Sequence, residues 1–221
     1  MNLWLILAFV FAALQVMVLR KALGRLEYLT KPAVMICLFL WLYTVTGLQG
    51  LAFWFGLGVL FSLAGDVFLM FPQERWFLYG LVAFLLAHIA YLAGFQNELK
   101  AFGFWQAVLL AILSVGGVRL MRRLIPSIRA GGQSRLVAPV ILYAAVISAM
   151  LYAAMTTLSN PAWKAGASLL VSGGAFLFYL SDIVLAWNKF VAPIQNGRII
   201  NIALYHLGQI GLIAGVIGQF G

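Results

Sequence analysis

The chain has 221 residues, of which 65% are hydrophobic and only 9% are charged. A soluble domain carries about 25% charged residues, so this composition excludes both a soluble globular protein and a disordered chain. The one cysteine, Cys37, lies in an apolar run and has no partner for an intrachain disulfide. Fourteen basic residues against five acids give a net charge of +9. In a chain this apolar, the charge first has to be tested as a membrane-topology signal.

Eight apolar runs are long enough to cross a bilayer, since a spanning helix needs roughly 20 mostly apolar residues. They cover residues 3–19, 33–49, 50–71, 76–96, 104–121, 136–158, 163–187 and 199–219. The second and third runs nearly touch, which predicts a tight helical hairpin at residues 47–50. Membrane-barrel strands alternate polar and apolar residues, and these runs do not. We therefore predict an all-α, polytopic membrane bundle of eight transmembrane helices in one domain, residues 1–221.

Proline removes a backbone donor and disturbs a helix interior. Five of the six prolines are accordingly expected between the spans, and Pro139 is expected in the first turn of the sixth, where proline is tolerated. The five are Pro32, Pro72, Pro126, Pro161 and Pro193. The first span is unlike a signal peptide, because its basic residues, Arg20 and Lys21, follow the apolar run. We expect an uncleaved first helix.

The basic residues separate by side when eight spans assign the loops. Lys100 and Lys164 fall on one side, and twelve fall on the other: Arg20, Lys21, Arg25, Lys31, Arg75, Arg119, Arg122, Arg123, Arg129, Arg135, Lys189 and Arg198. Cytoplasmic loops of membrane proteins carry such an excess of Lys and Arg. The twelve-residue side is therefore predicted to be cytoplasmic, with both termini outside. Topology accounts for the charge, so we expect no nucleic-acid partner; membrane lipids are the expected surroundings.

Two pairs of segments suggest an internal duplication. The third span contains GDVFLMF and the seventh SDIVLAW, and a histidine follows in the next span of each half. The aspartates, Asp66 and Asp182, and the histidines, His88 and His206, are separated by nearly the same offset. The offset predicts two parallel four-helix repeats, residues 1–103 and 104–221, as in membrane proteins built from parallel repeats.

Asp66 and Asp182 are the two acids expected at membrane depth, about 7–8 Å below the cytoplasmic boundary. An ionised carboxylate in hydrocarbon costs at least ~2.5–3.5 kcal/mol. Each aspartate must therefore face the interior, find a partner or keep its proton. A purely structural role, such as pairing with Lys31 or Lys189, is one interpretation; a functional site is the other. A metal held by the aspartates and histidines is a third, but neither HExxH nor a histidine pair at i, i+4 is present. We predict no metal and no cofactor.

Four segments give the chain a resemblance to the YhhN-like family of lysoplasmalogenases. They are TKPAV at 30–34, GDVFLMF at 65–71 with AHIAY at 87–91, SDIVLAWNKF at 181–190, and YHLGQIGLIA at 205–214. The last family motif usually reads Tyr-Tyr-x-x-Gln; here Tyr205 and Gln209 match it, and His206 replaces the second tyrosine. The resemblance implies hydrolysis of the vinyl ether bond of a lysophospholipid substrate, lysoplasmalogen. The products would be a fatty aldehyde and glycerophosphocholine or glycerophosphoethanolamine.

The residues fit this chemistry. Cleavage of a vinyl ether needs a positioned acid for its carbon and a negative charge beside the resulting cation. Asp66 and Asp182 are predicted to share these catalytic roles, in an order that the sequence leaves open. Further residues are predicted to bind substrate or to support the site: Lys31, His88, Tyr91, Ser181, Asn188, Lys189, Tyr205 and Gln209.

Two other functions remain open at this point. A proton-coupled membrane carrier using the same acidic pair also fits parallel repeats with buried acids. A lipid-binding scaffold without chemistry is the third interpretation. For the enzyme, we expect an integral, multi-pass protein, in the inner membrane if the chain is bacterial, with its active site toward the cytoplasmic leaflet. The oligomeric state, headgroup and chain preference are not predicted.

Overall fold

The computed structural model describes residues 2–95 and 103–221. In these ranges eight helices are long and apolar enough to cross a membrane. They are α1 (Leu3–Arg20), α2 (Gly24–Thr46), α3 (Ala52–Leu69), α4 (Glu74–Gly94), α5 (Phe104–Ala130), α6 (Val137–Thr156), α7 (Ala165–Phe190) and α8 (Gly197–Phe220). Short 3-10 helices, η1 (Ser134–Leu136) and η2 (Thr157–Ser159), flank α6. The predicted all-helical bundle is confirmed.

The predicted hairpin between the second and third spans is also confirmed. Gly47 ends α2 in the left-handed conformation, with φ of 60°, and its backbone N–H bonds to the carbonyl of Tyr43. Glycine adopts this conformation without a side-chain clash, which is why helices commonly end on it. The chain then turns directly into α3.

Pro32 lies inside α2, so the expectation that it separates two spans is wrong. The helix begins at Gly24, ahead of the apolar run, because its polar first turns have partners within the bundle. Glu27 in this extension accepts bonds of 2.6 and 2.7 Å from Arg198 of α8. Tertiary contacts there outweigh the backbone hydrogen bond that a proline removes.

Pro126 lies inside α5, and the same expectation is wrong for it. The helix continues past the predicted span as far as Ala130. Leu124 and Ile128, one turn apart on this extension, are buried. They pack in a small apolar cluster with residues of η1 and α6 (Leu136 and Val140). An apolar face at helical spacing therefore persists beyond the predicted span.

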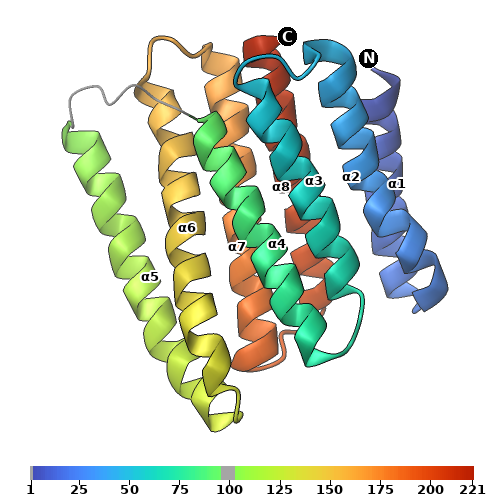
Figure 1. Ribbon diagram of the computed structural model, residues 1–221, viewed down its shortest axis with the longest axis vertical. Helices are drawn as coiled ribbons and strands as arrows, with labels where there is room; N and C mark the ends of the chain where they lie inside the picture. The colour runs from blue at the N-terminus through green and yellow to red at the C-terminus, as the bar shows by residue number, and fades with distance from the viewer. Residues whose placement is uncertain (1, 96–102) are drawn as a thin grey trace.

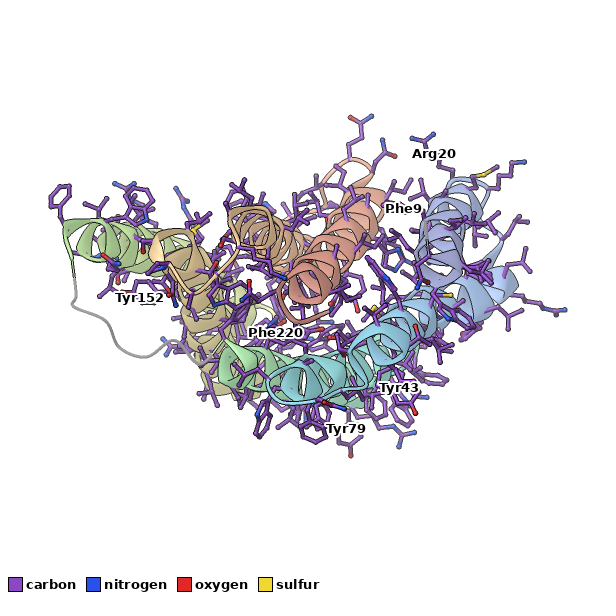
Figure 2. The ribbon with its side chains drawn as sticks, turned by 90° about the horizontal axis from the view of Figure 1, so that it is seen from above. Phe9, Arg20, Tyr43, Tyr79, Tyr152 and Phe220 are labelled. Carbon is purple, nitrogen blue, oxygen red and sulfur yellow. The ribbon has the colours of Figure 1, made fainter. Side chains whose placement is uncertain are left out.

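The eight helices form an elongated assembly with α1 and α5 at its two edges (Figure 1). Seen from above, α3 and α4 lie on one side of the middle of the assembly, and α7 and α8 lie on the other (Figure 2). The termini share one end with the α2–α3 and α6–α7 connections. The opposite end, called the basic end below, holds the α1–α2, α3–α4, α5–α6 and α7–α8 connections. Lys100, one of the two exceptions to the charge bias, lies outside the described residues.

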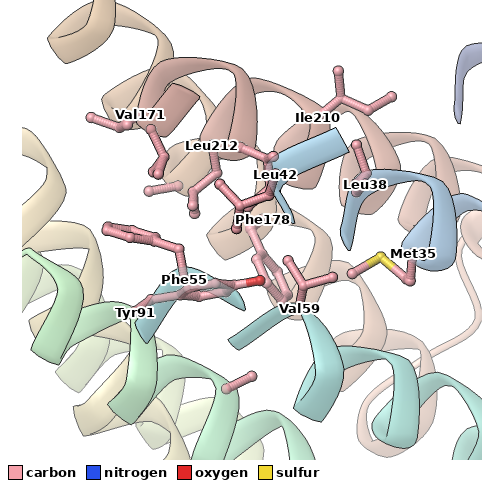
Figure 3. Packing of buried hydrophobic residues seen from close by; sticks show 14 of the residues in the cluster. Met35, Leu38, Leu42, Phe55, Val59, Tyr91, Val171, Phe178, Ile210 and Leu212 are labelled. Atoms are coloured by element: carbon pink, nitrogen blue, oxygen red, sulfur yellow. The ribbon is translucent and has the colours of Figure 1, made fainter. Parts of the chain in front are cut away.

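The main core is built where these four middle helices meet α2. Aromatic and aliphatic side chains fill it, among them Phe55 of α3, Tyr91 of α4 and Phe178 of α7 (Figure 3). In lipid the hydrophobic effect does not drive helices together, so close backbone approach through small residues matters more. At Gly174, an added Cβ would lie 2.3 Å from the backbone nitrogen of Leu212 and 2.6 Å from the carbonyl oxygen of Gly208. The α7 and α8 backbones are thus in direct contact.

Gly174→Ala is therefore expected to destabilise the protein. The clash is with backbone, which does not swing away as a flexible side chain would, and overpacking of this kind costs about 1–3 kcal/mol. Gly173→Ala is the matched control, since no atom lies within 4 Å of its added Cβ. Thermal unfolding in detergent should show a lower midpoint for Gly174→Ala alone. Equal midpoints for the two variants would contradict the close contact.

Candidate functional site

Asp66 lies in a buried ion pair on α3. Its side chain is 1% exposed, and its Oδ1 lies 3.0 Å from the Nζ of Lys31 on α2. The hydroxyl of Tyr205 on α8 donates to its Oδ2 at 2.7 Å. A buried charge is tolerated when it is paired and hydrogen-bonded in this way. Both carboxylate oxygens of Asp66 are therefore engaged by the protein.

A second set of buried polar groups lies on α3, α4 and α8. The hydroxyl of Tyr91 donates to Oε1 of Gln209 at 2.8 Å, and Nε2 of Gln209 donates to Oγ of Ser62 at 3.0 Å. All three side chains are buried. This chain ties α3, α4 and α8 together, and the structure brings the predicted residues Tyr91 and Gln209 into direct contact.

Asp182 on α7 has a different environment. The hydroxyl of Tyr143 on α6 donates to its Oδ2. The Nε2 of His88 on α4 lies 2.9 Å from the Tyr143 hydroxyl and 3.6 Å from Oδ2 of Asp182. The Tyr143 hydroxyl uses its one hydrogen in the bond to Asp182, so it can only accept a hydrogen bond from His88. The hydrogen of that second bond is therefore on Nε2 of His88. The side chain of Asp182 is 14% exposed, so one side of it faces free space.

Aromatic rings stand between the two aspartate sites. The ring of Phe178 lies 4.7 Å from that of His88 and 5.2 Å from that of Tyr205. Phe84 stands 5.8 Å from Tyr205 and 6.1 Å from Phe178, edge to face with both. The rings of Phe84 and Phe178 therefore separate the Asp66 site from the Asp182 site.

Asp182 lines a pocket between α4, α5, α6 and α7. The pocket holds a cavity of about 60 Å³, which is room for a few water molecules. Asp182 and Tyr143 line it among hydrocarbon and aromatic side chains, including Phe84 and Phe77. Asp66 is not among the lining residues. An apolar pocket with a few convergent polar groups is the usual form of a small-molecule site.

The remaining predicted residues lie toward the basic end or within the packing. Ser181 is fully buried and donates to the carbonyl of Phe178 at 2.7 Å, so it supports α7. Asn188 accepts from the backbone of Ile194 at 2.6 Å and fixes the α7–α8 connection. Lys189 is half-buried, with its Nζ 4.1 Å from the ring centre of Phe77, at the end of the pocket.

Tyr143 is the residue that sequence reasoning missed. It stands alone in an apolar span, VAPVILYAAVISAM, with no motif around it. Its position on helix α6 parallels that of Lys31 on α2, since each contacts the aspartate of the next helix.

The two histidines do not form part of a metal site within the described ranges. No group of three His, Cys, Asp or Glu side chains there is arranged to hold a metal ion. His206 is buried beside Tyr205, and neither of its ring nitrogens has a hydrogen-bond partner among the described residues.

Comparison with known proteins connects this arrangement to one family. The YhhN family model matches residues 26–216. Lysoplasmalogenase TMEM86B of Mus musculus is 29% identical over 186 residues, covering 84% of this chain and 73% of the relative. TMEM86B of Sus scrofa is 31% identical over 152 residues, 69% of this chain and 58% of the relative.

Lysoplasmalogenase TMEM86A of Homo sapiens is 29% identical over 155 residues, which are 69% of this chain and 60% of the relative. The chain thus spans well over half the length of each of these curated relatives. No solved structure matches the chain. With the match extending from α2 to α8 and including both aspartate helices, the chain belongs to the YhhN family.

Proposed function

We propose that this protein is a lysoplasmalogenase: a membrane hydrolase that cleaves the vinyl ether bond of lysoplasmalogen. One observation carries the proposal, namely the Asp182 carboxyl lining a largely apolar pocket while the hydroxyl of Tyr143 donates to its Oδ2. The relatives named lysoplasmalogenases support this class of substrate. The products would be a fatty aldehyde and glycerophosphocholine or glycerophosphoethanolamine.

In the proposed reaction Asp182 is the general acid. Its carboxylic acid gives a proton to the vinyl carbon farther from the ether oxygen, leaving an oxocarbenium ion at the nearer carbon. The carboxylate formed by this transfer lies beside the cation and stabilises it. Water then adds to the cationic carbon and returns a proton to Asp182. The hemiacetal collapses to aldehyde and alcohol, so one water is consumed and the acid is regenerated.

Asp66 has another task in this proposal. Lys31 already compensates its charge, and both its oxygens are engaged. We expect it to stay ionised and to hold Tyr205, which stacks edge to face on Phe84 of the pocket wall. This differs from the sequence-based expectation that one aspartate supplies the acid and the other the countercharge. The proton transfer itself creates the countercharge at Asp182.

Lys189 is the proposed contact for the phosphate of the headgroup. Its ammonium lies over Phe77, and Phe77 and Phe190 line the pocket toward the basic end. Lys31, another residue predicted to bind substrate or support the site, pairs with Asp66 instead. With the basic end on the cytoplasmic side, as the excess of Lys and Arg favours, the headgroup would lie in the cytoplasmic leaflet and both termini outside.

Tyr143→Phe is expected to lower kcat about tenfold to a hundredfold. A hydrogen bond to a charged group contributes about 1.5–3 kcal/mol, and about 1.4 kcal/mol corresponds to a factor of ten in rate. Tyr179→Phe is the matched control, because Tyr179 lines the same pocket and its hydroxyl accepts only a 3.4 Å bond from Ser148. Steady-state aldehyde release from both variants measures the difference; equal kcat values would remove Tyr143 from the site.

Product analysis tests the function itself. Purified protein in lipid vesicles is given lysoplasmalogen or the ester-linked lysolipid, and products are identified by mass spectrometry. We expect aldehyde from the first and no fatty acid from the second. Fatty acid from the ester alone would indicate a different hydrolase. Proton-linked solute uptake without bond cleavage would instead support the carrier.

A further inference from the structure

A second cavity runs between α5 and α6. It is a groove of about 810 Å³, and its walls are hydrocarbon, small side chains and few polar groups. On α5 it extends from Leu110 to Pro126, a rise of about 24 Å at 1.5 Å per residue. One leaflet of a bilayer supplies about half of a ~30 Å hydrocarbon core. The groove is therefore longer than the depth that one fatty chain occupies.

Small residues create the groove. Gly117 and Ser114 on α5 face Ala145, Ser148 and Ala149 on α6. An added Cβ at Gly117 meets no atom within 4 Å, so this position opens on space. Helix α5 is also the least buried of the eight spans, and it lies at the edge of the assembly beside α6 (Figure 1). The groove is thus accessible from the surrounding membrane.

The groove adjoins the Asp182 pocket. Met121 of α5 and Ala144 of α6 line both cavities. Ala144 also follows Tyr143, whose hydroxyl bonds Asp182. From this junction one branch leads to the pocket and to Lys189 at the basic end, and the other follows α5 toward Leu110. The Leu110 branch of the groove, the Asp182 carboxyl and the Lys189 ammonium therefore follow one another toward the basic end, while the last turn of the groove, with Arg122 and Pro126, lies beyond the junction.

We propose that the α5–α6 groove binds the hydrocarbon chain of the lysophospholipid substrate, entering sideways from the bilayer. This rests on the proposed function for its substrate class. The order of groups in the protein matches that of the lipid: the chain lies in the groove, the vinyl ether at the Met121–Ala144 junction beside Asp182, and the phosphate at Lys189. A single channel between two helices suits a lipid with one chain, and its far end at Leu110 and Tyr152 sets the preferred chain length.

Gly117→Leu tests the assignment, with Gly116→Leu as its control. Both glycines have open space at the Cβ position, so we expect either leucine to fit; of the two, Gly117 lines the groove and Gly116 does not. We expect Gly117→Leu to raise KM for a long-chain lysoplasmalogen about tenfold, the effect of losing contact with two methylenes. A short-chain analogue that ends before Gly117 should keep its KM. Ala145→Leu, an exposed groove position on α6, should repeat the effect if Gly117→Leu fails to fold.

A binding readout separates this inference from the chemistry. The saturated alkyl-ether analogue, which has no vinyl bond to cleave, carries a photoreactive diazirine in its chain. We expect crosslinks at residues 110–118 of α5 and 145–152 of α6 in the wild type and in Gly116→Leu, and their loss in Gly117→Leu. Crosslinks without aldehyde release would contradict the proposed function and leave the groove assigned. Aldehyde release with crosslinks elsewhere, or equal KM values for the two leucine variants, would overturn the inference.

Discussion

Asp182→Asn is expected to abolish aldehyde release, lowering kcat by at least about 100-fold. General acid catalysis contributes about 10²–10⁴ to the rate, and asparagine has no proton of carboxylic acidity to give to carbon. The amide keeps the volume of the side chain and can still accept from Tyr143, so folding should be little affected. Initial rates at saturating lysoplasmalogen measure the loss.

The control for this variant is Glu74→Gln, which neutralises another acid near the basic end. Glu74 pairs at the surface with Arg135 at 2.9 Å and is far more exposed than Asp182. Its rate should equal that of the wild type. An Asp182→Asn protein that folds and retains near wild-type kcat would remove the proton donor from the mechanism.

Lys31→Met is expected to have the largest effect on stability. It leaves the Asp66 carboxylate buried without its countercharge, and breaking a buried pair in this way costs about 3–5 kcal/mol. The 3.0 Å contact and the near-complete burial of both side chains place this pair in that class. Thermal unfolding in detergent or nanodiscs should show a large drop in the midpoint.

A double variant separates the lost charge from the lost packing. Lys31→Met combined with Asp66→Asn removes both charges, so much of the lost stability should return. Arg135→Gln is the surface control, because its exposed pair with Glu74 is worth only about 0–1 kcal/mol. If the double variant is no more stable than Lys31→Met, the pair does not act as a charge-compensated unit.

Most of the fold could be predicted from the sequence, because hydrocarbon thickness sets the length of a spanning helix. The run of apolar residues identified each span, and Gly47 marked the hairpin. The errors at Pro32 and Pro126 both come from tertiary packing. Helices continue into polar sequence when tertiary partners exist, as Arg198 provides for Glu27, and a single sequence does not show those partners.

The site was predictable in kind but not in detail. An acid in an apolar span implies a partner or a function, which identified Asp66 and Asp182. Which partner each acid takes depends on helix packing. The sequence left Lys31 open as a partner of an aspartate or as a substrate contact, and the structure pairs it with Asp66. Tyr143 is set in an unmarked apolar span, so its role follows only from the contact of α6 with α7.

We propose that residues 1–103 and 104–221 are duplicated halves. The two aspartate sites support this, since each takes one partner from the preceding helix and one from the fourth helix of the other half. Asp66 on α3 contacts Lys31 on α2 and Tyr205 on α8. Asp182 on α7 contacts Tyr143 on α6, with His88 of α4 beside it. In this proposal, one site kept a structural ion pair while the other opened onto a pocket.

Oxygen labelling tests the central claim most directly, namely that a proton from the pocket drives addition of water to the vinyl ether carbon. Purified protein cleaves lysoplasmalogen in H₂¹⁸O, with immediate reduction of the aldehyde to its alcohol. The account predicts ¹⁸O in the alcohol and none in the glycerophospho product, because the hemiacetal expels the original ether oxygen with glycerol. Label in the glycerol product, or no aldehyde from the wild-type protein, would contradict it.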